Sequence, residues 1–300
     1  MTTLAPFQIH RVLSVAEASE RLEELGDEAV IYSGGTELLL LMKLGFASYE
    51  HLVDIKPIEP LARLEVRDGQ LVIGGTVSHR TIERSEAVAR GWPDLAEMER
   101  RVANVRVRGT GSLGGNLAFA DPHSDPATFL LAAGASVELG RGEQRRSMSI
   151  EQFVLGPYET ALQAGELLCA IRVPPLGPGA AMAHLRFAFH ERPAATVSAW
   201  LAVTEGRLRD ARLAVGSVGV MPVLVPGVAD ALAGTDPAAI DGTLLASIGE
   251  AAARAAEPVS DSNGGDDYKA ALVRILVGRA IVEAAARAVH RSMNAKEVGA

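Results

Sequence analysis

Cysteine is almost absent from this sequence, since Cys169 is the only one in 300 residues. A disulfide within the chain is therefore impossible, and so is an iron–sulfur cluster held by the usual four thiolates. The seven histidines are scattered, and none pairs with a cysteine or carboxylate at metal-ligand spacing, so we expect no metal site. No Gly-x-Ser-x-Gly segment or other nucleophile signature occurs, so hydrolysis is unsupported and no side chain is predicted to be catalytic.

Aromatic residues and long apolar runs are also scarce. Aromatic side chains make up 4% of the chain against 48% for all hydrophobic residues, which predicts a core of Ala, Val and Leu. The apolar run 38–42 is far shorter than the ~20 residues that a membrane span needs, and no leader pattern opens the chain. The formal net charge of −8 argues against nucleic-acid binding. We expect a cytoplasmic protein without membrane insertion.

Glycine, by contrast, is concentrated in residues 106–125. Gly109, Gly111 and Gly114 satisfy the dinucleotide pattern G-x-G-x-x-G, which requires a buried strand before it and a long helix after it. The preceding residues are rich in arginine, and Asp121-Pro122 would stop a following helix after about two turns. We therefore discard a Rossmann topology and interpret the segment as a backbone cradle for an anion.

A second glycine turn, residues 33–37, lies between the apolar runs 29–32 and 38–42. This pattern predicts a strand, a tight turn and a helix that Thr36 caps, with first-turn N–H groups free to face an anion. One such turn is more often structural than functional. Two of them favour a ligand with a diphosphate.

The first 176 residues predict two subdomains. A helix over 14–25, with Ser14 and Glu17 as a capping box, precedes strands at 29–32 and 51–55 and a helix over 36–44. This succession indicates a small, mostly parallel sheet. A hairpin at 64–66 and 71–75, helices over 81–90 and 94–102, and further elements at 130–139 and 147–154 indicate a mixed subdomain. We expect the two glycine turns to face each other across a cleft.

A break rich in proline and glycine at 173–179 predicts the next boundary. Beyond it we expect a three-stranded antiparallel meander (181–189, 195–203, 208–215) and helices over 225–233, 240–256 and 266–289. The last helix is expected to pack on its own sheet rather than on a partner. The fold class is thus α+β, with predicted domains 1–57 and 58–176, which form the two subdomains, and 180–292.

The two glycine segments also carry a family resemblance. Residues 33–38 resemble the Ala-Gly-Gly-Thr-Asp-Leu loop, and residues 112–116 the Thr-Ile-Gly-Gly-Asn loop, of the FAD-binding medium subunits of molybdenum hydroxylases such as carbon monoxide and xanthine dehydrogenase. Segments 52–55, 71–75, 120–122 and 153–159 support it in the same order. The resemblance runs from Phe7 to about Arg287, nearly the whole chain.

The resemblance implies FAD as cofactor and a set of binding residues. The first loop is expected to contact the diphosphate and ribityl groups, the second loop to hold the diphosphate from the other side, and Asp125 to bond sugar hydroxyls. Leu168 would pack along the rings, and Arg186 stands where relatives often have a lysine close to the flavin. The full predicted set is Ile31, Tyr32, Ser33, Gly34, Gly35, Thr36, Glu37, Leu38, Gly111, Ser112, Gly114, Gly115, Asn116, Ala118, Ser124, Asp125, Leu168 and Arg186.

The resemblance also implies a function. The chain would be the flavin subunit of a multi-subunit dehydrogenase, passing electrons from a separate [2Fe-2S] subunit, itself supplied by a molybdenum cofactor subunit, through FAD to an external acceptor. Several relatives place an aromatic residue over the flavin where this chain has Ala194 and Ala195, which would leave the ring less shielded. The alternative is therefore a stand-alone flavoenzyme with a substrate pocket there. His123 is left open between a catalytic role and a polar residue that shapes the pocket.

Overall fold

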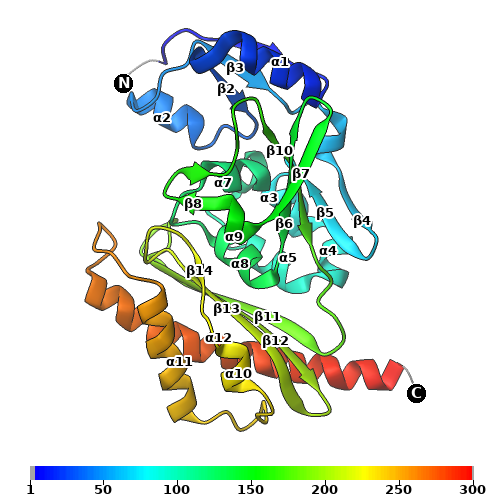
Figure 1. The fold of residues 1–300 in the computed structure, drawn as a ribbon, viewed down its shortest axis with the longest axis vertical. Coiled ribbons are helices and arrows are strands. Elements are labelled where there is room, and N and C mark those ends of the chain that lie inside the picture. The colour runs from blue at the N-terminus through cyan, green and yellow to red at the C-terminus, as the bar shows by residue number, and fades with distance from the viewer. Residues whose placement is uncertain (1–3, 299–300) are drawn as a thin grey trace.

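The computed structural model describes residues 4–298, so residues 1–3 of the first predicted domain lie outside that range. The fold begins with a parallel sheet. The strands β1 (Gln8–Arg11), β3 (His51–Asp54) and β2 (Ala29–Tyr32) form one sheet in that order. Helix α1 (Val15–Leu25) covers it, and α2 (Leu38–Leu44) follows β2. The parallel sheet expected from the sequence is confirmed (Figure 1).

Two details of helix capping in this first unit differ from expectation. Ser14 caps α1 by accepting from the N–H of Glu17, but the Glu17 carboxylate accepts from Leu13 N instead of Ser14 N, so the capping box is half formed. The predicted Thr36 cap of α2 is wrong, because the N-cap position is Glu37 and no side chain caps the helix. The Thr36 hydroxyl instead lies next to Gly111 of the second unit, so α2 begins without a side-chain cap.

The second unit is an antiparallel sheet of five strands in the order β4-β5-β10-β6-β7. Its strands are β4 (Leu64–Arg67), β5 (Gln70–Gly74), β10 (Leu167–Val173), β6 (Ser136–Arg141) and β7 (Gln144–Ser149), with a small ribbon of β8 (Val154–Gly156) and β9 (Glu159–Thr160) beside it. Its helices are α3 (His79–Arg84), α4 (Glu86–Gly91), α5 (Pro93–Glu99), α6 (Val105–Thr110), α7 (Leu113–Phe119), α8 (Asp125–Ala133) and α9 (Ile150–Phe153).

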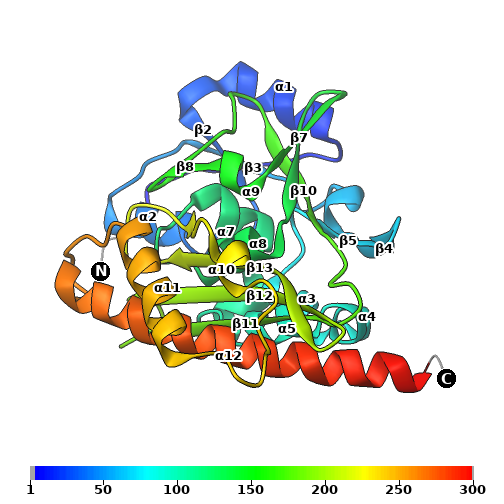
Figure 2. The same cartoon turned by 60° about the horizontal axis from the view of Figure 1, so that its bottom comes forward.

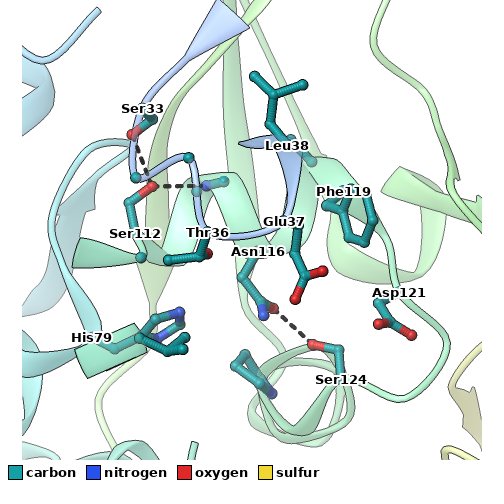
Figure 3. Close-up of a pocket in the computed structure, with 18 of the residues that line it drawn as sticks. Ser33, Thr36, Glu37, Leu38, His79, Ser112, Asn116, Phe119, Asp121 and Ser124 are labelled. Atoms are coloured by element: carbon teal, nitrogen blue, oxygen red, sulfur yellow. Dashed lines mark hydrogen bonds between the residues drawn. The ribbon is translucent and has the colours of Figure 1, made fainter. Parts of the chain in front are cut away.

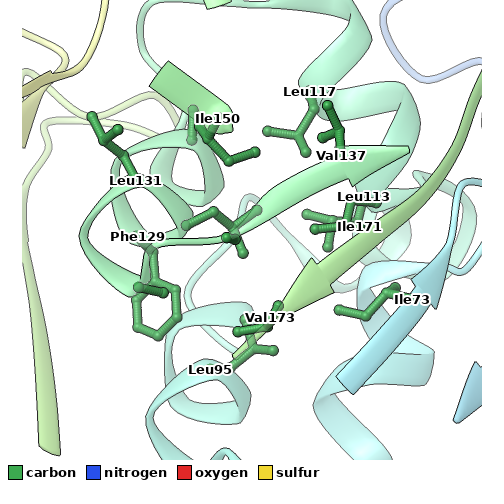
Figure 4. Close-up of a cluster of buried hydrophobic side chains, with 14 of the residues drawn as sticks. Ile73, Leu95, Leu113, Leu117, Phe129, Leu131, Val137, Ile150, Ile171 and Val173 are labelled. Carbon is green, nitrogen blue, oxygen red and sulfur yellow. The ribbon is translucent and has the colours of Figure 1, made fainter. Parts of the chain in front are cut away.

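Residues 81–90, predicted as one helix, form parts of two. Ser85 has an extended backbone between α3 and α4, and its side chain accepts from the N–H of Val88, so it ends the first helix and caps the second. Apolar residues from α5, α7, α8 and the sheet pack together behind these short helices (Figure 4). Phe129 and Leu113 are among the fully buried members, which fixes α7 and α8 against the sheet.

The third unit is an antiparallel sheet of β11 (Ala180–Phe187), β12 (Ala195–Thr204), β13 (Arg207–Gly216) and β14 (Val223–Leu224). The predicted meander is confirmed, and the two-residue β14 adds a fourth strand that no sequence pattern indicated. Helices α10 (Val228–Leu232), α11 (Gly242–Ala255) and α12 (Asp266–Val298) follow. Figure 2 shows α12 running across the sheet, while α8 of the second unit packs on β12 and β13.

The last helix also ties the third unit to the second. As expected, α12 packs its apolar side on its own sheet, with Val277 and Ile281 fully buried. Near its end, Arg291 makes two 2.8 Å hydrogen bonds to the buried Asp94 carboxylate of α5, and Asp94 also accepts from Met182 N of β11. This pairing fixes the angle between the two units. Among the helices described, none combines the length and apolar character that crossing a bilayer requires.

Candidate functional site

A cavity of about 400 Å³ lies between the first two units and extends to the third (Figure 3). Drug-sized and cofactor ligands usually occupy cavities of roughly 300–1,000 Å³. The cavity opens where β2 leads into residues 33–37, at the carboxyl end of the parallel sheet, which is where α/β folds place ligands. Its walls include backbone from residues 33–38 and 111–116 and apolar side chains such as Leu41, Leu162 and Leu168.

The two glycine segments meet at this cavity, as the sequence predicts. The Ser33 and Ser112 hydroxyls are 2.9 Å apart, and a Cβ on Gly34 would lie 2.5 Å from Thr110 O. Real Cβ atoms essentially never come so close, so only glycine allows this approach of two chain segments. We call the surface formed by Gly34, Gly35, Gly111, Gly114 and Gly115 the glycine wall.

Part of the second glycine segment forms the helix α7 beside the cavity. Ser112 caps α7 by accepting from the N–H of Gly115, and α7 ends after two turns at Ala120, just before Asp121-Pro122. Gly109 lies within α6 instead, and a Cβ on Gly114 would lie 2.4 Å from Gly75 O. The described elements immediately before α7 are the helices α5 and α6 and not a strand, in agreement with the rejected Rossmann topology.

The first glycine segment offers unpaired backbone donors. Within residues 4–298, the N–H groups of Gly34, Gly35, Thr36 and Glu37 have no hydrogen-bond acceptor. Gly35 adopts a φ of +68°, in the region that favours glycine, and residues 34–37 all line the cavity. Partly buried donors without partners are the observation that fits an anionic group such as a diphosphate.

Side chains from the second and third units close the cavity on another side. We call Asp121, His123, Asp125, Glu191 and Arg192 the ionic wall. Arg192 lies 3.0 Å from Glu37 Oε2 and 3.1 Å from Asp121 Oδ2, and so joins all three units across the cavity mouth. Glu191, next to it, accepts a 2.6 Å hydrogen bond from Asn104.

Two members of the ionic wall are fixed by the third unit. Asp125 is 4% exposed and lies 3.0 Å from His184 Nε2 and 3.4 Å from Arg186 Nη1, so both carboxylate oxygens face β11. His123 bonds Pro193 O at 2.9 Å through Nδ1 and lies 3.2 Å from Asp261 through Nε2. Burial raises the pKa of the Asp261 carboxyl, but the hydrogen bonds from Lys269 and Asn263 N–H and the charges of Lys269 and His123 together outweigh it and lower that pKa overall.

All but two of the predicted binding residues line the cavity. Tyr32 lies outside it with Lys56 Nζ 3.7 Å from its ring centroid, and Arg186 is held by the carbonyls of Arg101 and Glu191. Ser124 donates to Asn116 Oδ1 at 2.7 Å and so orients the amide at the cavity. Asp125, expected to bond sugar hydroxyls, lines the cavity but already has partners for both oxygens.

The structure also corrects the interpretation of Ala194 and Ala195. Both are fully buried, and neither lines the cavity. Ala194 N instead donates to Phe187 O at 2.8 Å, and Ala195 pairs with Phe187 in the sheet. These small residues lie inside the third unit and do not border the cavity, so they create no space for a substrate there.

Several lining residues had no local sequence signal. They come from elements that only the tertiary fold brings to the cavity: His79, Val102, Leu162, Glu191 and Arg192. Away from the cavity, Glu28, Glu50 and His51 place ligand atoms within 4.8 Å of one another on the surface, a grouping that the expectation of no metal site did not foresee. Cys169 is buried, as expected, and burial raises its thiol pKa to about 11.

Two family models match successive parts of the chain. Residues 5–176 match the FAD binding domain in molybdopterin dehydrogenase, and residues 181–284 match the CO dehydrogenase flavoprotein C-terminal domain. The first model alone covers more than half of the chain. Together they span both glycine segments and most of the third unit.

Whole-chain comparisons agree with these matches. The chain is 31% identical to the carbon monoxide dehydrogenase medium chain of Afipia carboxidovorans, with 94% of this chain and 98% of that one covered, and 31% identical to the nicotine 6-hydroxylase medium subunit of Paenarthrobacter nicotinovorans, with 91% and 95% covered. Its fold matches a chain of the Hydrogenophaga pseudoflava carbon monoxide dehydrogenase structure with a TM-score of 0.90 at 30% identity, covering 95% of this chain and 99% of that one.

Proposed function

The chain belongs to the FAD-binding medium subunits of the molybdenum hydroxylases, and from that premise we propose which residues bind FAD and which partners complete the complex. The meeting of the two glycine segments carries the proposal. It places unpaired N–H groups of residues 34–37 against the first turn of α7, in a cavity of the size that ligands use. These features fit a dinucleotide whose diphosphate needs donors from two sides.

We propose a separate role in FAD binding for each part of the cavity lining. The unpaired N–H groups of residues 34–37 would donate to the diphosphate, and the apolar Leu162 and Leu168 would exclude water from the rings. Glu37 is already neutralised by Arg192, which would close the cavity mouth over the bound cofactor. Bound FAD would supply the electron-transfer chemistry, which this chain's side chains cannot perform alone.

We further propose two partners for this chain, a [2Fe-2S] subunit and a molybdenum cofactor subunit. The single cysteine supports this, because the chain cannot itself hold a four-thiolate cluster that would relay electrons to FAD. The relatives are named as medium chains or subunits, which favours a component of a complex over a stand-alone flavoenzyme. We also propose a cytoplasmic location. For the domains we propose the division 1–57, 58–176 and 180–292, supported by the three hydrophobic clusters among the described residues, each of which draws most of its members from one of these ranges.

The experiment compares two samples. One is the recombinant chain produced alone, and the other is an affinity-tagged chain purified from its native host. The recombinant chain should contain FAD but neither iron nor molybdenum, and should not turn over hydroxylase substrates. The tagged native sample should carry iron and molybdenum by elemental analysis, in subunits that co-elute with the chain on size exclusion. Sustained turnover of a small organic substrate by the isolated, metal-free chain would overturn the proposal.

A further inference from the structure

A buried histidine and a buried glutamate form a pair beneath the glycine wall. His79, the first residue of α3, is 2% exposed, and Glu99, the last residue of α5, is fully buried. His79 Nδ1 lies 2.7 Å from Glu99 Oε2. The other carboxylate oxygen, Oε1, is buried with no hydrogen-bond partner among the residues described.

The opposite edge of the imidazole faces the glycine wall. His79 lines the cavity, its backbone N–H donates to Gly111 O at 3.1 Å, and a Cβ on Gly111 would lie 3.6 Å from His79 Cδ2. Figure 3 shows the ring reaching toward the cavity below Thr36 and Ser112. With Nδ1 committed to Glu99, the edge that carries Nε2 is the one available to a ligand.

The contact with Glu99 fixes the orientation of the imidazole. Both side chains are buried, and the Nδ1–Oε2 distance of 2.7 Å makes Nδ1 the ring atom that serves Glu99. An imidazole has two ring nitrogens, and the one that carries hydrogen donates. Nε2 is therefore the ring nitrogen that can donate to an anion on the cavity side.

The other basic groups of the cavity are already engaged. Arg192 pairs with Glu37 and Asp121, and His123 is held by Pro193 O and Asp261. Within the described lining residues, His79 is thus the basic side chain with an uncommitted edge at the glycine wall.

We propose that Glu99 orients His79 so that its Nε2–H donates to the diphosphate of the cofactor. His79 is then a cofactor-binding residue, and Glu99 is a positioning residue that acts through it. This inference rests on the proposed function, because the anion is the FAD diphosphate. One side-chain donor is thereby added to the backbone donors of residues 34–37.

The test measures FAD affinity of the apo-protein by titration of cofactor fluorescence. Glu99→Gln keeps the size of the side chain but removes the carboxylate that fixes the ring, and His79→Gln removes the imidazole itself. Each should weaken FAD binding roughly tenfold, as expected for loss of a hydrogen bond to the charged diphosphate. Since the two residues act as one unit, the double variant should bind no more weakly than His79→Gln alone.

The matched control is Glu166→Gln, which also removes a buried carboxylate, one paired with Arg146 outside the cavity. It should leave FAD affinity unchanged. The ³¹P NMR signals of bound diphosphate add a readout that a purely structural role would not move: they should shift in Glu99→Gln and not in Glu166→Gln. If His79→Gln fails to fold, the FAD affinity and ³¹P signals of the near-isosteric Glu99→Gln test the proposal by themselves.

Wild-type affinity and ³¹P signals in Glu99→Gln would overturn this inference while leaving the proposed FAD site intact. Failure of the unmodified protein to bind FAD at all would instead overturn the proposed function, and this inference with it. The two failures are therefore distinguishable from the same set of titrations.

Discussion

The two walls of the cavity are built in opposite ways. The glycine wall uses backbone donors and depends on the absence of side chains, since Cβ atoms on Gly34 or Gly114 would collide with backbone of the neighbouring segment. The ionic wall consists of side chains that pair across units, such as Arg192 with Glu37 and Asp125 with His184. Backbone placement is rigid and shape-determined, whereas the pairs that the half-exposed Arg192 makes with Glu37 and Asp121 contribute little each. We therefore expect the glycine wall to set affinity and the ionic wall to adjust it.

The largest expected effect comes from Gly34→Val. The new side chain would force apart the first and second units at Thr110 and Gly111, at a cost of about 3 kcal/mol or more in unfolding free energy. Thermal unfolding and retained FAD should both fall sharply. Gly109→Ala is the control, because that glycine lies within α6 with open space around it, and the change should stabilise by about 0.5–1 kcal/mol. Equal behaviour of the two variants would contradict the packing role of Gly34.

Gly115→Val should separate binding from folding. A Cβ there would approach only the Ser112 hydroxyl, at 2.9 Å, so the folded state should survive with a smaller loss of stability than in Gly34→Val. The branched side chain would occupy the ligand-facing first turn of α7, and FAD should bind at least tenfold more weakly, a loss of about 1.4 kcal/mol or more. Calorimetric titration measures this, with Gly115→Ala as the milder variant. Unchanged affinity would make Gly115 a turn residue only.

Arg192→Met should have a smaller effect on the same titration. Its guanidinium is half exposed and neutralises Glu37 and Asp121, so its loss leaves two carboxylates near an anionic ligand. We expect FAD affinity to fall less than about fivefold, and the difference to shrink as salt is raised. Arg209→Met, which removes an exposed pair with Glu205, is the matched control and should change nothing. A loss larger than that of Gly115→Val would reverse the proposed ranking of the walls.

The smallest effect is expected at Cys169, which does not line the cavity. Its thiol packs in the cluster with Val12 and Val15 of the first unit, and burial raises its pKa to about 11. Native protein should therefore label slowly with a thiol reagent at pH 8 and faster only as the pH approaches that value, whereas the unfolded chain titrates near about 8.5. Cys169→Ser should leave FAD affinity unchanged. Fast native labelling at pH 8 would show that the first two units separate readily.

The same contrast explains what the sequence could predict. The glycine wall was predictable because its residues lie in two short segments whose composition requires tight turns, and α1, β2 and the β4–β5 hairpin were predictable from periodic apolar positions and turn residues. The break at Ser85 depends on a single cap, and Thr36 lost its predicted cap to a contact with another unit.

The pairing of side chains in the ionic wall could not be predicted in this way. Its pairs join residues far apart in sequence, 59 positions for Asp125 and His184 and 155 for Arg192 and Glu37. Charged residues of this kind look like ordinary surface positions in the sequence. His79 and Glu99 were missed for the same reason, since their pairing appears only when α3 packs against α5.

The most direct test of the account is the cofactor content of the purified chain. Denaturation should release about one FAD per chain into the supernatant, with none left covalently attached to the protein. Release of a nicotinamide dinucleotide in its place, or failure to take up FAD even after incubation with an excess, would contradict the assignment of the glycine wall as a flavin dinucleotide site.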